Sequence, residues 1–463
     1  MTTTTGTDVA ELRARLHGGL HEPGDPQYDD TCTLFNAMVD HRPRLVARCS
    51  TVDDVVTSLG FARAHGLEVA VRAGGHSVTG RSLCEGGLVI DVRPMREVSV
   101  DLVRRLVRVG GGATWADVDR ACQPHGLATT GGRVSTTGVV GLTLGGGSGW
   151  LERKHGLACD NLVAAELVTA TGELVRVDAG HHPELLWALR GGGANFGVVV
   201  AVELRLHELP DAVLAGLVLH PADRGPELLR LFRDLMLDAP DELGLAFAHI
   251  TGPDDADVPA ELRGRPAVVV AGMYAGPVEA GERALRELRA FGPPAADFFE
   301  PTTYDAFQCS LDDPPGYRNY WTAEHVTDLS DDAIDAITRR AAELPASPSQ
   351  VFIVPWGGAV ARVGHDTSPL AGREAAFIVH PLLLWEDPAD DERMIGLGRS
   401  FRDDLAPFSS GATYLNFLGD EGPDRVRAGF GPSYERLERV KTAWDPDDVF
   451  RGNQSLRALA DAT

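Results

Sequence analysis

Three of the glycine clusters in the first 200 residues place the strongest limit on what this chain can fold into. Gly74-Gly75 ends an alternating apolar run that predicts a strand, and runs of three glycines follow at 145–147 and 191–193. Glycine lets the backbone turn sharply and approach a ligand closely, and successive backbone N–H groups in such a loop form a concave anion site. Any one cluster is compatible with a tight turn between strands. Three in one half of the chain favour a backbone that wraps a large anionic cofactor.

Residues 129–150 form the densest stretch of small side chains in the sequence. Glycine, threonine and serine bury too little apolar area for this stretch to serve as core. A backbone without bulky side chains can instead lie against a flat ligand and offer it N–H groups. We therefore expect this segment to belong to the same ligand site as the three glycine clusters.

Composition excludes several classes of function. The 463 residues are enough for two or three domains, and the formal net charge of -24 repels nucleic acid and anionic membranes. No apolar run approaches the ~18 residues of a membrane span, and the first residues lack the features of a secretory signal. Six cysteines occur without CxxC spacing, so we expect reduced thiols and no metal site. These features predict a soluble, cytoplasmic protein.

The composition and the pattern of expected helices and strands change twice along the chain, which predicts three structural parts. Residues 1–206 mix strands and helices around the glycine loops, with strands expected at 42–49, 67–72, 88–92, 106–109, 162–170, 173–177 and 198–206. Residues 207–410 alternate acidic, alanine-rich helices (226–237, 278–291 and 331–344) with strands (267–273, 350–354 and 375–384). This order predicts an α/β or α+β layer with helices over one face of a sheet. We expect residues 411–463 to return to the first part.

Several longer motifs occur in a characteristic order. They are Arg72-Ala-Gly-Gly-His76-Ser77, Leu144-Gly-Gly-Gly147, His155-Gly-Leu-Ala-Cys-Asp160-Asn161-Leu162, Arg190-Gly-Gly-Gly-Ala-Asn195-Phe-Gly197, Tyr414-x-Asn416, Trp444-Asp-Pro446 and Phe450-Arg-x-Asn453-Gln454. Together they resemble the FAD-linked oxidases with a PCMH-type FAD-binding domain. The C-terminal motifs resemble the berberine-bridge-enzyme-like group, and the sequence around Phe417 resembles its bacterial members similar to 6-hydroxy-D-nicotine oxidase.

The resemblance implies an α/β (α+β) fold in three parts: a two-subdomain FAD-binding domain (1–206), a substrate-binding domain with an antiparallel sheet covered by helices (207–410), and a returning segment (411–463). The residues that it assigns to FAD are Arg72, Gly74, Gly75, His76, Ser77, Thr136, Thr137, Gly138, Val139, Gly141, Leu144, Gly145, Gly146, Gly149, Trp150, Asp160, Asn161, Gly197, Val198, Tyr414, Asn416 and Asn453.

His76 stands where the resemblance implies a covalent bond to the 8α-methyl carbon of the flavin. A neutral imidazole is a nucleophile, and a glycine loop can press it against the ring edge. Some family members add a second link through a cysteine, but Val134 occupies that position here, so we expect a single link. Val139 falls near the position that governs oxygen access in this family, which favours an oxidase over a dehydrogenase; simple loop packing is the other interpretation of this residue.

The catalytic base is less clearly indicated. In many plant members a tyrosine ends the Tyr-x-Asn-Tyr motif, whereas this chain has Phe417, which has no proton to exchange. Either a neutral amine substrate gives up hydride without a strong base, or another group serves. His380, on the strand expected at 375–384, is then the candidate. We also assign Tyr414 and Asn416 to the catalytic site beside the flavin, and Tyr320 and Trp321 to the pocket wall.

These features predict an FAD-dependent oxidase that removes a hydride from a small amine or alcohol, such as a secondary metabolite, and reduces O2 to H2O2. The expected partners are this small molecule and O2, with no nucleic acid and no membrane. A flavin dehydrogenase or a carbohydrate oxidase on the same scaffold is the alternative. A flavoprotein that binds without turnover is a third hypothesis, motivated by the missing tyrosine.

Overall fold

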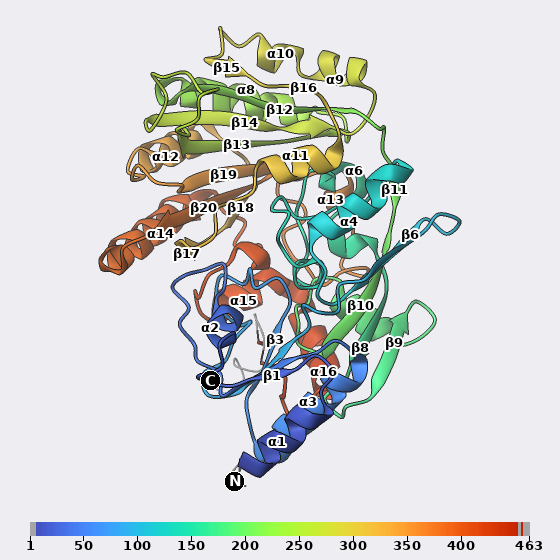
Figure 1. Ribbon diagram of the computed structural model, residues 1–463. Coiled ribbons are helices and arrows are strands. Elements are labelled where there is room, and N and C mark those ends of the chain that lie inside the picture. The colour runs from blue at the N-terminus through green and yellow to red at the C-terminus, as the bar shows by residue number, and fades with distance from the viewer. Residues whose placement is uncertain (1–5, 452–454, 457–463) are drawn as a thin grey trace.

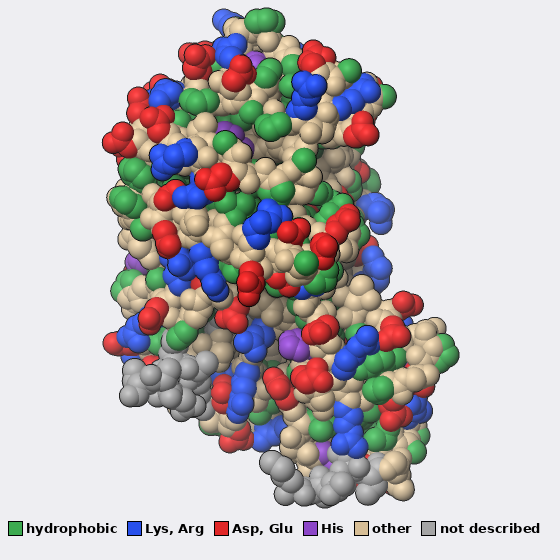
Figure 2. Space-filling view, turned by 90° about the vertical axis from the view of Figure 1, so that its left-hand side faces the viewer, with side chains coloured by type: hydrophobic (Ala, Val, Ile, Leu, Met, Phe, Trp, Pro, Cys, Tyr) green, Lys and Arg blue, Asp and Glu red, His purple; other side chains and the backbone are tan. Residues whose placement is uncertain are grey.

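The computed structural model describes residues 6–451 and 455–456. In addition to a two-stranded pairing between residues 127–128 and 207–208, two small sheets form one half of the molecule and a single large sheet forms the other. Both described ends of the chain lie on the side of the small sheets (Figure 1). The predicted position Asn453 lies outside the described residues. Figure 2 shows acidic and basic side chains interspersed over one face of the molecule.

The first small sheet has the strand order β1-β2-β4-β3, and its three four-residue strands are built mostly from buried valine, leucine, isoleucine and alanine. Strand β4 pairs in parallel with both β2 and β3, as expected of strands buried on both faces. The elements are α1 (Gly6–Arg15), β1 (Leu20–His21), α2 (Tyr28–Cys32), β2 (Leu45–Arg48), α3 (Val52–His65), β3 (Val69–Arg72) and β4 (Leu88–Asp91).

Helix α3 shows how the sequence sets local structure in this half. The sequence Ser50-Thr51-Val52-Asp53 has the Ser-x-x-Asp pattern of a capping box, but the capping box lies one residue later. Thr51 Oγ1 accepts from the Asp54 N–H, and the Asp54 carboxylate accepts from the Thr51 N–H. The helix ends at Gly66, which adopts a left-handed conformation with φ 63°.

The second small sheet is antiparallel, with the order β5-β6-β10-β8-β9. The predicted hairpin between residues 162 and 177 forms β8 and β9, and the glycine-dense segment contains a short helix, α5. The elements are β5 (Val98–Asp101), β6 (Leu106–Gly110), α4 (Trp115–Cys122), β7 (Leu127–Ala128), α5 (Val139–Leu144), α6 (Glu152–His155), β8 (Leu162–Val168), β9 (Leu174–Asp178), α7 (Pro183–Leu189), β10 (Val198–Arg205) and β11 (His207–Glu208).

The large sheet has nine strands with the main order β15-β12-β14-β13-β19-β20-β17, and it is antiparallel throughout. This confirms the predicted antiparallel sheet. Its strands are β12 (Val213–Pro221), β13 (Leu243–Thr251), β14 (Pro266–Tyr274), β15 (Ala296–Asp297), β16 (Glu300–Thr302), β17 (Arg318–Trp321), β18 (Glu324–Val326), β19 (Gln350–Pro355) and β20 (Phe377–Trp385). The helices that accompany it are α8 (Gly225–Leu237), α9 (Val278–Ala284), α10 (Arg286–Arg289), α11 (Tyr304–Ser310), α12 (Asp331–Ala341), α13 (Gly358–Ala361) and α14 (Asp391–Leu405).

The two faces of the large sheet differ in what covers them. Side chains alternate between faces along a strand. On β13, Phe247 packs into a core with residues of the long helices α8, α12 and α14, whereas its neighbours Ala246 and Ala248 face the opposite way, toward the small sheets. The large sheet therefore presents one helix-covered face and one face to a cavity.

The C-terminal segment contains α15 (Pro423–Phe430) and α16 (Tyr434–Trp444), and α16 packs against α7 in the half with the small sheets. Its Lys441 is fully buried: Nζ donates to the Asn195 carbonyl oxygen at 2.9 Å and pairs with the Asp445 carboxylate at 2.6 Å. Among the described residues, no helix is long and apolar enough to cross a membrane, and no cluster of potential metal ligands occurs.

Candidate active site

A cavity of ≈ 570 Å³ lies between the two halves of the molecule. Its walls come from segments that are far apart in the sequence: the loop after β3, the segment from Gly132 to Ser148, the inner face of the large sheet and the residues around Asn416. The cavity is continuous from the first small sheet, at Val69 and Val71, to the strands of the large sheet.

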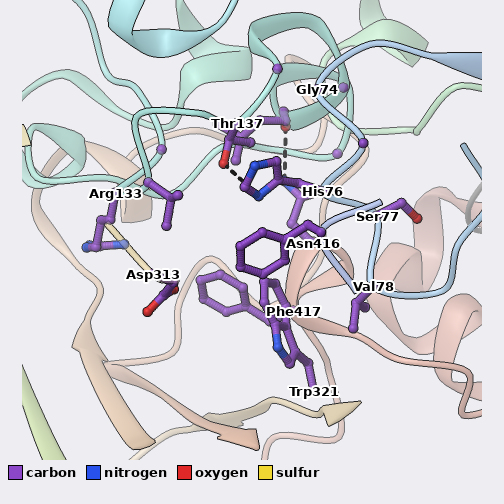
Figure 3. Close-up of a pocket in the computed structure, with 18 of the residues that line it drawn as sticks. Gly74, His76, Ser77, Val78, Arg133, Thr137, Asp313, Trp321, Asn416 and Phe417 are labelled. Carbon is purple, nitrogen blue, oxygen red and sulfur yellow. Dashed lines mark hydrogen bonds between the residues drawn. The ribbon is translucent and has the colours of Figure 1, made fainter. Parts of the chain in front are cut away.

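His76 lies on the cavity wall, where three neighbours fix its ring (Figure 3). Its Nε2 is 3.1 Å from Thr136 Oγ1 and its Nδ1 is 3.3 Å from Thr137 Oγ1, and the ring stacks on Phe35 at 4.4 Å. Burial lowers the pKa of His76 to about 4, against a smaller opposing effect of Asp312. The imidazole is therefore neutral at pH 7 and keeps a nitrogen lone pair.

The glycines of the cavity wall fit a large flat ligand. A Cβ on Gly141 would have no atom within 4 Å, so this face of helix α5 presents bare backbone to the cavity. Gly74 and Gly138 approach each other so closely that a Cβ on either would overlap the backbone of the other. Two segments that are distant in sequence thus meet through glycines at the position where FAD is expected.

Tyr414 lies behind the glycine loop and does not line the cavity. Its hydroxyl oxygen accepts hydrogen bonds from the N–H groups of Gly147 at 2.6 Å and Ser148 at 2.9 Å. Asn416 does line the cavity, and its Nδ2 donates to the Leu142 carbonyl oxygen at 2.9 Å. Both side chains fix the shape of the loop that contains Gly145, since Asn416 Oδ1 fills the space that a Cβ on Gly145 would need.

His380 lines the cavity and is held in one tautomer by an irregularity of the sheet. Pro381 follows His380 on β20, and the Thr322 N–H donates to the Pro381 carbonyl oxygen at 3.3 Å. Because proline has no N–H, Pro381 cannot donate a hydrogen bond back to the Thr322 carbonyl oxygen. Instead, His380 Nδ1 lies 2.8 Å from the Thr322 carbonyl oxygen, and because a carbonyl only accepts, Nδ1 carries the proton.

The other ring nitrogen of His380 is therefore an acceptor. Nε2 is buried without a hydrogen-bond partner among the described residues, and burial lowers the pKa of His380 to about 4. The ring stacks on Phe417 with centroids 4.1 Å apart and planes 3° from parallel, and Trp321 contacts it edge-on. Trp321 forms part of the cavity wall, as predicted, whereas Tyr320 does not, because its ring packs over Gly398 of α14.

The structure brings many of the predicted cofactor residues together on the cavity wall and places others behind it. Those on the wall are Gly74, Gly75, His76, Ser77, Thr137, Gly138, Gly141, Leu144, Gly145, Trp150, Gly197 and Asn416. Those that do not line it are Arg72, Thr136, Val139, Gly146, Gly149, Asp160, Asn161, Val198 and Tyr414.

Most of the predicted residues that lie behind the wall form hydrogen bonds or apolar contacts with other parts of the protein. The Arg72 guanidinium donates to the Thr31 and Thr33 carbonyl oxygens. Val139 and Val198 are fully buried in apolar cores, so the Val139 side chain does not reach the cavity.

The Asp160-Asn161 motif also stabilises the fold rather than the cavity wall. Asp160 forms a buried ion pair with Arg373 at 2.8 Å. Asn161 Nδ2 donates to two carbonyl oxygens of its own loop, and its Oδ1 contacts His207 Nε2 at 2.7 Å.

Several polar residues of the wall were not predicted from the sequence, among them Arg133, Asp312, Asp313 and Gln350. Arg133 is already committed to Glu152, with 2.8 Å between Nη2 and Oε1, and lies over the Trp150 ring. The tandem carboxylates before Pro314-Pro315 were the available signal, because prolines hold a loop open and keep such side chains out of a helix.

Comparison with known proteins gives two matching family models. Residues 43–178 match the FAD binding domain, and residues 413–457 match the domain described as berberine and berberine like. The chain is 32% identical to the (R)-6-hydroxynicotine oxidase of Paenarthrobacter nicotinovorans over 95% of this chain and 97% of that protein. It is 29% identical to an FAD-linked oxidoreductase of Dictyostelium discoideum over 97% of each chain.

Solved structures agree over almost the whole chain. The crystal structure of 6-hydroxy-D-nicotine oxidase from Arthrobacter nicotinovorans superimposes with a TM-score of 0.86 at 29% identity, covering 95% of this chain and 98% of that one. A berberine-bridge-enzyme-like protein of Physcomitrella patens gives a TM-score of 0.88 at 21% identity, covering 97% and 98%, which shows the same fold. This chain therefore belongs to the berberine-bridge-enzyme-like family of FAD-linked oxidoreductases, with FAD as its cofactor.

Proposed function

We propose that this protein is an FAD-dependent oxidase that removes a hydride from a carbon beside nitrogen or oxygen in a small organic molecule. When bound, FAD supplies the hydride acceptor and the site at which O2 is reduced to H2O2. The observation that carries the proposal is the neutral His76 on a glycine-lined wall of a cavity that continues to the face of the large sheet. In this proposal residues 1–206 bind FAD, residues 207–410 bind substrate, and residues 411–463 return to the FAD-binding part.

His76 is the proposed site of a single covalent link to FAD. The two threonine hydroxyls and the stacked Phe35 hold the imidazole in place, and its low pKa keeps a lone pair available for bond formation at pH 7. Val134 lines the same cavity and has no thiol, which supports one link rather than two.

His380 is the proposed polar contact for the reacting end of the substrate. Its Nε2 lone pair accepts a hydrogen bond from a substrate N–H or O–H, because Nδ1 is held by Thr322. Phe417 cannot exchange a proton, but its ring fixes the imidazole plane. Asn416, which lines the same cavity, positions the glycine loop by donating to the Leu142 carbonyl oxygen.

The walls of the cavity favour an amine or alcohol with an apolar body over a carbohydrate. The sheet face toward the cavity consists largely of alanine, valine, leucine and isoleucine, which offer no hydrogen bonds to a sugar. Secondary-metabolite oxidation in a cytoplasmic setting fits such a substrate.

Two assays test this function. After acid precipitation, the yellow colour should stay with the wild-type protein and be absent from the pellet of His76→Ala. Peroxide release should occur with at least one member of a panel of cyclic amines and aromatic alcohols. Flavin bleaching without peroxide would indicate a dehydrogenase, and no bleaching with any compound would contradict an oxidoreductase acting on this substrate class.

A further inference from the structure

Asp313 lies on the cavity wall in the loop that follows α11, on the same side of the cavity as Arg133 (Figure 3). Its Oδ1 accepts a hydrogen bond of 3.1 Å from Gln350 Nε2. Gln350 pairs with Leu382 across the sheet, so His380 is its diagonal neighbour on the same face. Asp313 therefore lines the same cavity as His380, whose buried Nε2 has no hydrogen-bond partner among the described residues.

The charge at this end of the cavity is negative and uncompensated. Neither Asp312 nor Asp313 forms an ion pair with any described residue; Asp312 instead accepts hydrogen bonds from the Ser135 N–H and hydroxyl at 2.5 and 2.6 Å. The nearby Arg133 is neutralised by Glu152. Burial, and secondly the charge of Asp312, raises the pKa of Asp313 to about 6. A carboxylate without a cation in a confined cavity takes up a proton at low pH, and above its pKa its charge favours a cation that enters the cavity.

Next to this acidic end the sheet is lined by unusually small side chains. Ala246 and Ala248 on β13 and Ala271 on β14 all line the cavity, with Ala246 directly opposite Ala271 in the sheet register. Three alanines on neighbouring strands leave a shallow apolar depression, which suits a hydrophobic ring or chain.

We propose that Asp313 determines specificity by pairing with a positively charged group of the substrate, such as a protonated amine, while the apolar body of the substrate lies against Ala246, Ala248 and Ala271. This inference rests on the proposed function, since it names the substrate class of the same site. Within that class it selects cationic amines over neutral alcohols.

The test compares ligands of equal size and different charge on the FAD-loaded protein. Dissociation constants for 2-phenylethylammonium and for 2-phenylethanol are measured at pH 8 from the change in flavin absorbance. Wild type should bind the cation about tenfold more tightly, as expected for a hydrogen bond between charged groups. This preference should shrink as the pH falls below about 6, where Asp313 becomes protonated.

The variant Asp313→Asn keeps the shape and removes the charge, so it should bind both probes equally. Asp254→Asn, which makes the same charge change on an exposed loop, should keep the wild-type preference. Asp313→Glu keeps the negative charge and should therefore retain part of the preference for the cationic probe. Equal binding of both probes by wild type, or an unchanged preference in Asp313→Asn, would overturn the inference.

A separate variant tests the proposed contact between the apolar body of the substrate and the three alanines. Ala248→Leu fills the depression, so it should weaken binding of both phenyl probes while the charge preference persists; unchanged affinity would overturn this placement. These titrations involve no turnover. A missing charge preference therefore counts against this inference alone, whereas missing peroxide counts against the proposed oxidase function.

Discussion

Tyr414→Phe removes one oxygen atom that satisfies two backbone donors of the glycine loop. The N–H groups of Gly147 and Ser148 both donate to the hydroxyl of Tyr414, a residue that is 1% exposed. A buried donor left without an acceptor costs about 1–3 kcal/mol. With two such donors, and some relaxation of the loop, we expect a loss of about 2–4 kcal/mol in the free energy of unfolding.

Urea unfolding followed by tryptophan fluorescence measures this loss, and hydrogen exchange of the peptide containing Gly147 and Ser148 locates it. The matched control is Tyr274→Phe, because the Tyr274 hydroxyl has no hydrogen-bond partner among the described residues. A change below about 0.5 kcal/mol, as for an ordinary surface substitution, would refute the role assigned to this hydroxyl. So would unchanged exchange of the two amides.

Three further perturbations test other parts of the structure. Gly141→Leu should project a side chain into the cavity, lowering the FAD content measured by the ratio of flavin to protein absorbance, while the free energy of unfolding of the apoprotein changes by less than about 1 kcal/mol; full FAD content would contradict this. Arg373→Met strands the buried Asp160 carboxylate and should lower the free energy of unfolding by about 3–5 kcal/mol, whereas Arg362→Met, which breaks an exposed pair, should change it little. Burial lowers the pKa of His249 from 6.5 to about 4, so in acid the unfolded chain binds a proton at His249 before the folded protein does. The stability that depends on neutral His249 is therefore complete above pH 6.5 and is lost as the pH falls toward 4. Between pH 7.5 and pH 4.5 this amounts to about 2 kcal/mol, and His249→Gln should lose correspondingly less stability than wild type over that range in urea titrations.

The sequence predicted best where local pattern and tertiary environment agree. The hairpin of β8 and β9 and the strands flanking the first glycine loop follow apolar alternation and turn residues that the fold preserves. Strands β12 and β13 and helix α14 were missed. In α14 two glycines weaken the helical pattern, and only the structure reveals that Gly398 is required because the Tyr320 ring packs against it.

The candidate site was predicted in outline and not in its detailed contacts. The glycine motifs indicated the cavity wall, because bare backbone is visible in a sequence. The sequence cannot reveal that Tyr414 lies behind the wall, that Pro381 fixes the tautomer of His380, or that Asp313 meets Gln350. Each of these depends on contacts between residues tens to hundreds of positions apart.

The most direct test of the whole account is mass spectrometry of the peptide that contains His76, prepared from acid-denatured wild-type protein. We predict that this peptide is heavier by one FAD, with fragmentation placing the added mass on His76. An unmodified His76 peptide, with all of the FAD released into the acid supernatant, would contradict it.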